Sequence, residues 1–345
     1  MAGTAKPTQR TLALTRRLNL NYVKREQLTI ERRRNGDGFT YWTADGVQIK
    51  NPVLLRRFAS LAVPPAYKQV RFNPDERAHL QAVGRDAAGR LQYRYHPEWR
   101  KIREATKAKR LATLATVMPR IRRAIAQHLS GREPTREFAL AAAIELVGAS
   151  AIRAGNEEYV KQHGTRGALT LLKSNVRVSG YKVTLVFRGK GGKEIRREFS
   201  SPRLAAAIPV LRTLPGARLF QYRDESGDAR SATAKDVNVF LREIAGSDVS
   251  LKDFRTLSAS AAVLENLART ARAPSERKRR KQVLEAVKAA AEDLANTPAV
   301  CRRSYVHEAV VSAFEKGHLE NFLKSRRSRA QCERFLARVV ASSGM

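Results

Sequence analysis

The chain has 345 residues, more than one hydrophobic core usually contains, so two domains are expected. Its 66 Lys and Arg residues against 32 Asp and Glu leave a formal net charge of +34, which favours a polyanionic partner such as nucleic acid, because a compact cationic protein otherwise repels itself. No long apolar run suggests a membrane protein, and two cysteines are too few for a disulfide framework or a cysteine metal site, which indicates a reducing, cytoplasmic setting.

The N-terminal part of the sequence predicts a basic arm followed by a small β-rich domain. Residues 1–28 are expected to form a disordered arm on nucleic acid, since the first 25 contain no acidic side chain and are rich in Arg and Thr. Between residues 29 and 104, short strand-like runs alternate with turn signals such as Asn35-Gly-Asp-Gly38.

The run His79–His96 contains the strongest candidates for nucleic-acid contacts in this domain. Two strand-like runs flank a turn there, and Gln92, Tyr93 and Tyr95 crowd the second run. A glutamine can read adenine edges and a tyrosine can bind a phosphate, so these three residues are predicted to contact DNA. The alternative is a solvated basic strand whose aromatic side chains pack in the core.

Residues 105–345 read as a mostly helical domain. Apolar residues at helical spacing from Phe138 to Ala151 predict a helix that stops at Gly155-Asn156, which places Arg153 on its last turn. An arginine there complements the helix dipole and needs no further function, so a functional reading of Arg153 depends on finding partners.

A strand-rich island follows, with strands expected at 168–172, 176–178, 181–187 and 194–199. The glycines of Arg188-Gly-Lys-Gly-Gly-Lys193 mark a hairpin tip that carries Lys190 outward. This is not a nucleotide-binding loop, because a strand rather than a helix follows it. Taken alone, a lysine on a glycine turn is mostly just a solvated tip, so a functional reading of Lys190 depends on other residues.

A further helix is expected to begin near Ser250, with Asp253 as its cap. This places Lys252 and Arg255 in or near the first turn. A cation there opposes the helix dipole by about 0.3–1 kcal/mol, and such an inconsistency tends to mark a functional site. Together with the free amides of the turn, Arg255 would make a cradle for phosphate.

The last informative stretch surrounds Tyr305. Thr297-Pro298 predicts the start of a helix that continues through Tyr305, with Val306, Val310 and Phe314 as its buried stripe. A tyrosine hydroxyl close to arginines can hold or attack a phosphate, although most tyrosines are packing residues. The acidic residues at 224, 225 and 228 fit no metal-binding loop, and no metal or other cofactor is expected.

In order, these residues are Arg153, Lys190, Lys252-Asp-Phe-Arg255, Asn296 and Tyr305, and this pattern resembles the type IB DNA topoisomerases of the poxvirus-like and bacterial branch. The similarity runs from about residue 30 to about residue 312. It includes Ile152-Arg-Ala-Gly-Asn-Glu-Glu-Tyr159, Gln92-Tyr-Arg-Tyr-His96 and Ser304-Tyr-Val-His307.

The resemblance implies an α+β protein in which a small β-rich N-terminal domain (29–104) closes over duplex DNA opposite a mostly helical catalytic domain (105–345) with a small antiparallel sheet. It implies Tyr305 as the nucleophile, Arg153 and Arg255 as phosphate clamps, and Lys190 as the general acid. Asn296 stands where many relatives have histidine and is expected only to orient the phosphate. Tyr159 and Lys252 are expected DNA contacts.

The implied activity is relaxation of supercoils of either sign by a monomer near the nucleoid, without ATP or metal, through a 3′-phosphotyrosyl intermediate. Two other readings remain open. A tyrosine recombinase uses the same chemistry, but usually has His-x-x-Arg where this chain has Lys252-Asp-Phe-Arg255. A non-enzymatic architectural DNA-binding protein would also suit the charge.

Overall fold

The computed structural model describes residues 7–320 and 329–342. The chain divides into two compact units, residues 1–106 and 107–345, and this division lies two residues after the one predicted from the sequence. Helix α3 (Trp99–His128) begins in the first unit and continues in the second. The expected α+β class is confirmed: the first unit is rich in strands and the second is largely helical, with a small antiparallel sheet.

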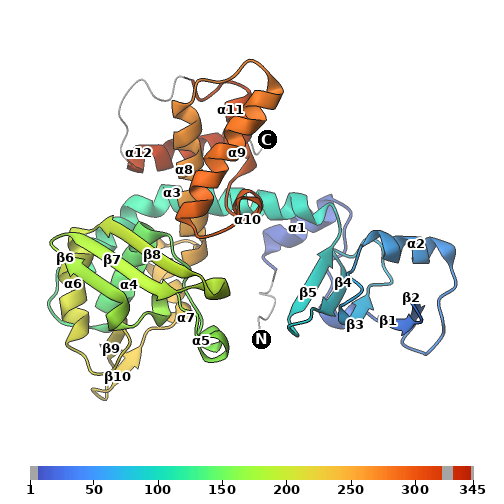
Figure 1. Ribbon diagram of the computed structural model, residues 1–345, viewed down its shortest axis with the longest axis horizontal. Helices are drawn as coiled ribbons and strands as arrows, with labels where there is room; N and C mark the ends of the chain where they lie inside the picture. Colours follow the sequence, from blue (N-terminus) through green and yellow to red (C-terminus); the bar gives the residue numbers. More distant parts are fainter. Residues whose placement is uncertain (1–6, 321–328, 343–345) are drawn as a thin grey trace. The chain divides into compact units, whose positions relative to one another are not determined.

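The first unit is built on one antiparallel sheet of five strands in the order β2-β1-β3-β4-β5 (Figure 1). The predicted turn at Gly36-Asp37 joins the first two strands, and Gly36 adopts a positive φ of 55°, which glycine allows without strain. The bounds are α1 Gln9–Arg17, β1 Ile30–Asn35, β2 Gly38–Trp42, α2 Pro52–Ser60, β3 Lys68–Phe72, β4 Leu80–Arg85 and β5 Leu91–Tyr95.

Two small hydrophobic clusters stabilise this unit. One contains Phe58 of α2 packed against Val70, Phe72 and Ala82 of the sheet. The other contains apolar residues from the segment that precedes β1, packed against β4: Val23, Leu28, Ala78, Leu80 and Val83. The expectation of a disordered arm is therefore wrong for residues 7–28, because α1 forms there and the apolar residues that follow it belong to the core.

The second unit combines a three-stranded antiparallel sheet, order β6-β7-β8, with helices that pack on it and on one another. Helices α4 and α6 pack against the sheet, while α8 contacts α9, α11 and α12 (Figure 1). The bounds are α4 Arg136–Ser150, α5 Glu157–His163, β6 Val176–Ser179, β7 Lys182–Arg188, β8 Glu194–Ser200, α6 Pro202–Arg212, β9 Gln221–Arg223, β10 Ala229–Ser231, α7 Ala234–Ala245, α8 Leu251–Arg269, α9 Glu276–Asp293, α10 Pro298–Ser304, α11 Glu308–Glu315 and α12 Arg329–Ser342.

Three of the four strands expected in the island are present, and one is not. The run Ala168–Thr170 forms a turn of 3₁₀ helix instead of a strand, because its backbone bonds locally and to the segment after α4. Thr170 N–H donates to the Gly167 carbonyl, and Ala168 N–H donates to the Arg153 carbonyl. Among the described helices, none is long and apolar enough to cross a membrane.

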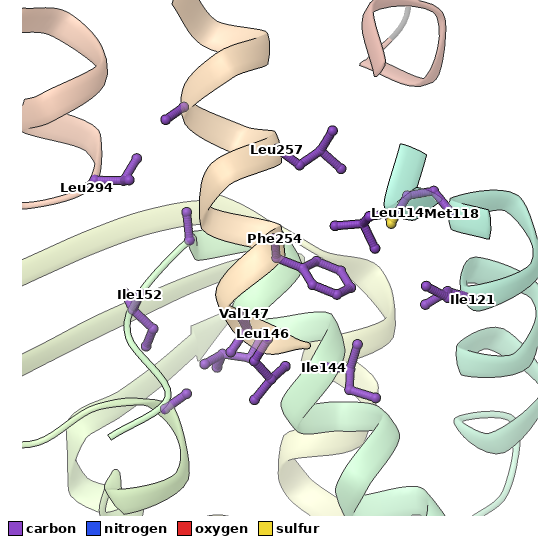
Figure 2. Close-up of a cluster of buried hydrophobic side chains, with 14 of the residues drawn as sticks. Leu114, Met118, Ile121, Ile144, Leu146, Val147, Ile152, Phe254, Leu257 and Leu294 are labelled. Atoms are coloured by element: carbon purple, nitrogen blue, oxygen red, sulfur yellow. The ribbon is translucent and has the colours of Figure 1, made fainter. Parts of the chain in front are cut away.

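The core of the second unit lies where α3, α4 and α8 meet (Figure 2). Several of its members are the immediate chain neighbours of polar residues singled out above. Ile152 precedes Arg153 and is 6% exposed, and Phe254 precedes Arg255 and is 5% exposed. Burial of these apolar neighbours fixes the backbone from which each arginine projects.

Candidate active site

Tyr305 lies at a break between two helices rather than inside one. Thr297 caps α10 by accepting a hydrogen bond from the Val300 N–H (3.3 Å), and Pro298 is the first helical residue, as predicted. The helix then ends at Ser304, and Tyr305 has φ −123° and ψ −27°. The expected continuous helix is wrong, because His307 caps a new helix, α11, by accepting from the Ala309 N–H (3.1 Å).

The backbone at this break is held by side chains from two other helices. Ser260 of α8 is fully buried, donates to the Tyr305 carbonyl (2.9 Å) and accepts from the His307 N–H (3.1 Å). Lys107 of α3 donates to the Val306 carbonyl (3.2 Å). Neither Ser260 nor Lys107 carries a local sequence signal, because each acts on a segment far away in the chain. Together they fix the direction in which Tyr305 leaves the backbone.

Arg255 packs against the ring of Tyr305 and is only 3% exposed. Its guanidinium carbon lies 5.0 Å from the centre of the Tyr305 ring. One terminal nitrogen donates to the Ala151 carbonyl at the end of α4, and the other donates to the Leu294 carbonyl at the end of α9 (3.0 Å). Burial lowers the pKa of Arg255 below its ordinary value, while the neighbouring Tyr305 raises it.

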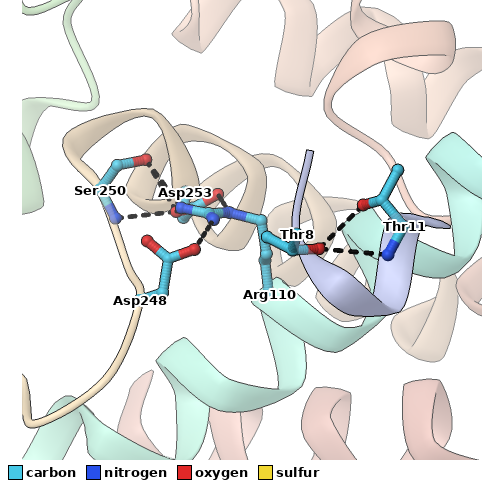
Figure 3. Close-up of polar contacts among 6 residues, drawn as sticks. All are labelled: Thr8, Thr11, Arg110, Asp248, Ser250 and Asp253. Carbon is cyan, nitrogen blue, oxygen red and sulfur yellow. Dashed lines mark hydrogen bonds and ion pairs between the residues drawn. The ribbon is translucent and has the colours of Figure 1, made fainter. Parts of the chain in front are cut away.

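The N-cap of α8, the helix that carries Arg255, is Ser250 and not Asp253. Asp253 instead reaches back from the third helical position and accepts from the Ser250 N–H and hydroxyl, both at 2.8 Å. Arg110 of α3 donates to Asp253 (2.8 Å) and to Asp248 (2.7 Å), so one guanidinium ties α3 to the start of α8 (Figure 3). Lys252, in the same first turn, is exposed.

Arg153 lies beyond the end of its helix instead of on the last turn. α4 ends at Ser150, and Ala151 adopts a left-handed conformation with φ 52°. The predicted stop at Gly155-Asn156 is therefore wrong by several residues, and Asn156 instead caps α5. Arg153 projects from the following loop and donates to the Asn296 side-chain oxygen at 2.5 Å. Asn296 thus lies beside Arg153.

Lys190 lies at the tip of the β7–β8 hairpin, as predicted. The strands pair from Lys182↔Ser200 to Arg188↔Glu194, and Gly189 N–H donates to the Lys193 carbonyl (2.8 Å) to close the tip. The Lys190 side chain is exposed. It lines a small cavity of about 20 Å³ together with Arg153 and Arg255. A further lining residue, Arg166, was not singled out from the sequence because it stands in a short loop without a motif.

The five candidate catalytic residues therefore all lie in the second unit, where two contacts and one shared cavity connect them. Contacts join Tyr305 to Arg255 and Arg153 to Asn296, and the cavity joins Lys190 to both arginines. Tyr159 on α5 is 49% exposed and lies in the same unit. The arrangement places a partly buried tyrosine against one buried arginine, which shares a cavity with a second arginine and a lysine, and such a set of groups suits chemistry on a phosphate.

Gln92, Tyr93 and Tyr95 belong to the first unit. Gln92 donates to Asp86 (2.9 Å), so its amide is engaged within the hairpin. Tyr93 and Tyr95 pack against one of the two hydrophobic clusters, which agrees with the packing alternative for their rings. Burial raises the pKa of Tyr95.

The acidic residues near position 224 form the turn between β9 and β10. Asp224 pairs with Arg230 at 2.5 Å, and the hydrogen bond from Arg230 holds the pKa of Asp224 below its usual value. In the part of the chain that the structure describes, no three His, Cys, Asp or Glu side chains gather as metal ligands would.

Comparison with known proteins points to one family for both units. Residues 96–331 match the family model described as the catalytic core of eukaryotic DNA topoisomerase I, and residues 38–86 match that of the N-terminal domain of bacterial DNA topoisomerase IB. DNA topoisomerase 1B of Acanthamoeba polyphaga mimivirus is 30% identical over 293 residues, which cover 83% of this chain and 87% of the relative. DNA topoisomerase 1B of vaccinia virus (strain Copenhagen) is 25% identical over 264 residues, 75% of this chain and 78% of the relative.

Proposed function

Because the chain belongs to the type IB DNA topoisomerase family, we propose that it relaxes supercoiled DNA by cutting and resealing one strand through Tyr305. Its substrate is DNA, in keeping with the net charge of +34. We assign the nucleophile to Tyr305, the phosphate clamps to Arg153 and Arg255, the orienting amide to Asn296 and the general acid to Lys190.

The observation that carries this assignment is the environment of Arg255. Its guanidinium is buried, and among the described residues no carboxylate pairs with it. Both terminal nitrogens donate to carbonyls, but the Nε–H has no hydrogen-bond partner in that part of the chain. A buried charge without a counter-ion is costly, so an anion that completes this site is strongly favoured. A phosphodiester beside the Tyr305 hydroxyl would supply that anion.

The first step forms one bond and breaks one bond. The Tyr305 hydroxyl gives up its proton to solvent, and its oxygen attacks the scissile phosphorus. The bond from phosphorus to the 5′ oxygen breaks, which leaves a 3′-phosphotyrosyl linkage and, once the 5′ oxygen is protonated, a free 5′ hydroxyl. Arg153 and Arg255 stabilise the charge on the non-bridging oxygens. Lys190, on an exposed hairpin tip, gives a proton to the leaving 5′ oxygen.

Resealing is the reverse step. The 5′ hydroxyl returns its proton to Lys190, attacks phosphorus and expels the Tyr305 oxygen. The phosphotyrosyl linkage conserves the energy of the broken bond, so no nucleotide is needed. Between the two steps the free 5′ end rotates and releases twist of either sign. We further propose that the protein acts as a monomer on the nucleoid, with the hairpin that carries Gln92 closing on the other side of the duplex.

The test is covalent trapping. Wild-type protein is mixed with supercoiled plasmid and stopped with detergent, and protein attached to DNA is measured. Tyr305→Phe should form no adduct and keep its affinity for duplex, since only a hydroxyl is lost. Tyr159→Phe is the matched control and should still form adduct. Adduct formed by Tyr305→Phe, or none formed by the wild type, would refute the proposal.

A further inference from the structure

Arg166 lies between the two elements that carry Arg153 and Lys190. Its N–H donates to the carbonyl of Arg188 (2.7 Å), two residues before Lys190 at the base of the hairpin. Two residues after Arg166, the Ala168 N–H donates to the Arg153 carbonyl (2.8 Å). The short loop around Arg166 therefore bonds through its main chain to the backbone of one proposed clamp and to the strand that leads to the proposed acid.

This loop approaches Arg153 so closely that only glycine fits beside Arg166. A Cβ on Gly167 would lie 2.5 Å from both the Arg153 carbonyl oxygen and the Gly155 nitrogen, closer than a real Cβ can come. Because both contacts are to backbone, a larger residue could not be accommodated by rotating a side chain. The position of the main chain at Arg166 is thus fixed relative to Arg153.

The Arg166 side chain lines the cavity shared by Arg153, Lys190 and Arg255. It donates to the Thr170 carbonyl (3.0 Å) and is partly exposed. Arg218 donates to the same carbonyl (2.5 Å), so the Thr170 carbonyl keeps a hydrogen-bond donor without Arg166.

The charge of Arg166 is not balanced by a carboxylate. The carboxylate of Glu157 raises the pKa of Arg166, but it pairs with Arg218 at 2.5 Å; Asp293 lines the same cavity and forms no ion pair with Arg166 in the described part of the chain. Across residues 7–320 and 329–342, no ion pair joins Arg166 to an acidic side chain. Burial and the neighbouring Arg218 both lower the pKa of Arg166. A cation held beside other cations, with unused donors and an open side, favours a bound anion.

We infer that Arg166 is a positioning residue that binds the backbone phosphate adjacent to the scissile phosphate on the cleaved strand. In the proposed function the scissile phosphate is bound by Arg153, Arg255, Asn296 and Lys190. Arg166 instead bonds to Thr170 and, through its main chain, to the hairpin base. A second anchored phosphate would fix the strand's direction for in-line attack. This inference rests on the proposed function and deepens it.

The experiment measures single-turnover cleavage of a short duplex in which one phosphate at a time is replaced by an uncharged methylphosphonate. Arg166→Gln keeps a donor for Thr170 but removes the charge, and should cleave the ordinary duplex about 10- to 100-fold more slowly, the worth of one charge-assisted hydrogen bond. Arg166→Lys should recover much of this rate. The matched control is Arg177→Gln, which removes an exposed cation on β6 outside the cavity and should change nothing.

Neutralising one phosphate next to the scissile one should slow the wild type by a similar factor and should not slow Arg166→Gln further. The inference would be overturned if methylphosphonate at every position slowed Arg166→Gln by the same factor as the wild type. It would also be overturned if Arg166→Gln cleaved the ordinary duplex as fast as the wild type. A lysine variant as slow as the glutamine variant would overturn it as well. If the glutamine variant fails to fold, the wild-type measurements still test the inference. A wild-type cleavage rate that is unchanged by methylphosphonate at every phosphate next to the scissile one would overturn it. Adduct formation by the wild type in the same assay tests the proposed function independently, so the role of Arg166 can fail while the proposed function holds.

Discussion

Arg255 has one structural role and one proposed catalytic role, and Arg255→Lys should weaken both by different amounts. In the wild type, the two terminal nitrogens satisfy the carbonyls of Ala151 and Leu294, which end two helices. A lysine ammonium on one stem can reach only one of them. The Leu294 carbonyl also accepts from the Asn296 amide (3.3 Å), so the carbonyl at risk is that of Ala151, and a buried carbonyl left without a donor costs about 1–3 kcal/mol. The free energy of unfolding should therefore fall by about that amount. Loss of a donor at the phosphate should slow cleavage by about 10²–10³-fold.

The assays are urea unfolding, followed by far-UV circular dichroism, and the rate of detergent-trapped adduct in a single turnover. Arg153→Lys is the matched control, because Arg153 is partly exposed and its one side-chain hydrogen bond described above goes to Asn296. It should slow cleavage while changing the unfolding free energy by less than about 0.5 kcal/mol. Equal stability of wild type and Arg255→Lys, or equal destabilisation by the two lysine variants, would refute the reasoning.

Three further predictions follow from the site and from the first unit. Lys190→Ala should slow cleavage of an ordinary phosphodiester far more than of one with sulfur at the bridging 5′ position, since a thiolate leaves without a proton; equal slowing would remove Lys190 as the acid. The protein should relax plasmid of either sign in chelator without ATP, with an optimum in salt because release speeds up before affinity fails; strict dependence on magnesium or ATP would contradict this. Burial lowers the pKa of His79 to about 4, so its contribution to stability is complete above pH 6.5 and is lost as the pH falls toward 4. In urea unfolding, the free energy of unfolding at pH 5 should be roughly 2 kcal/mol lower than above pH 6.5, and this decrease should be absent in His79→Asn. Equal pH dependence of the two proteins would exclude His79 as the cause.

The sequence predicted the elements whose signals are local. The start of α10 at Thr297-Pro298 and the hairpin tip at Lys190 were found because capping and glycine turns depend on residues only a few positions apart. The break at Tyr305 was missed because Val306, Val310 and Phe314 are all buried, as an unbroken helix would also have them. What ends the helix is distant: Ser260 holds both sides of the break from α8.

The end of α4 was missed for the same kind of reason. Alanine is not a residue that signals a left-handed helix end, yet Ala151 adopts that conformation. Its carbonyl binds Arg255, which lies 104 residues later. Arg166 was missed because one arginine among 66 basic residues has no local mark, and only its place in the cavity distinguishes it.

The proposed catalytic groups are dispersed, since Arg153, Lys190, Arg255, Asn296 and Tyr305 come from separate segments and meet only through tertiary contacts. During synthesis the nucleophile leaves the ribosome last of the five, after every cation that it needs. On the proposed assignment, a nascent chain that lacks Tyr305 should bind DNA through its many basic residues without cutting it. A fragment that ends before Tyr305 should therefore bind DNA without forming a covalent adduct.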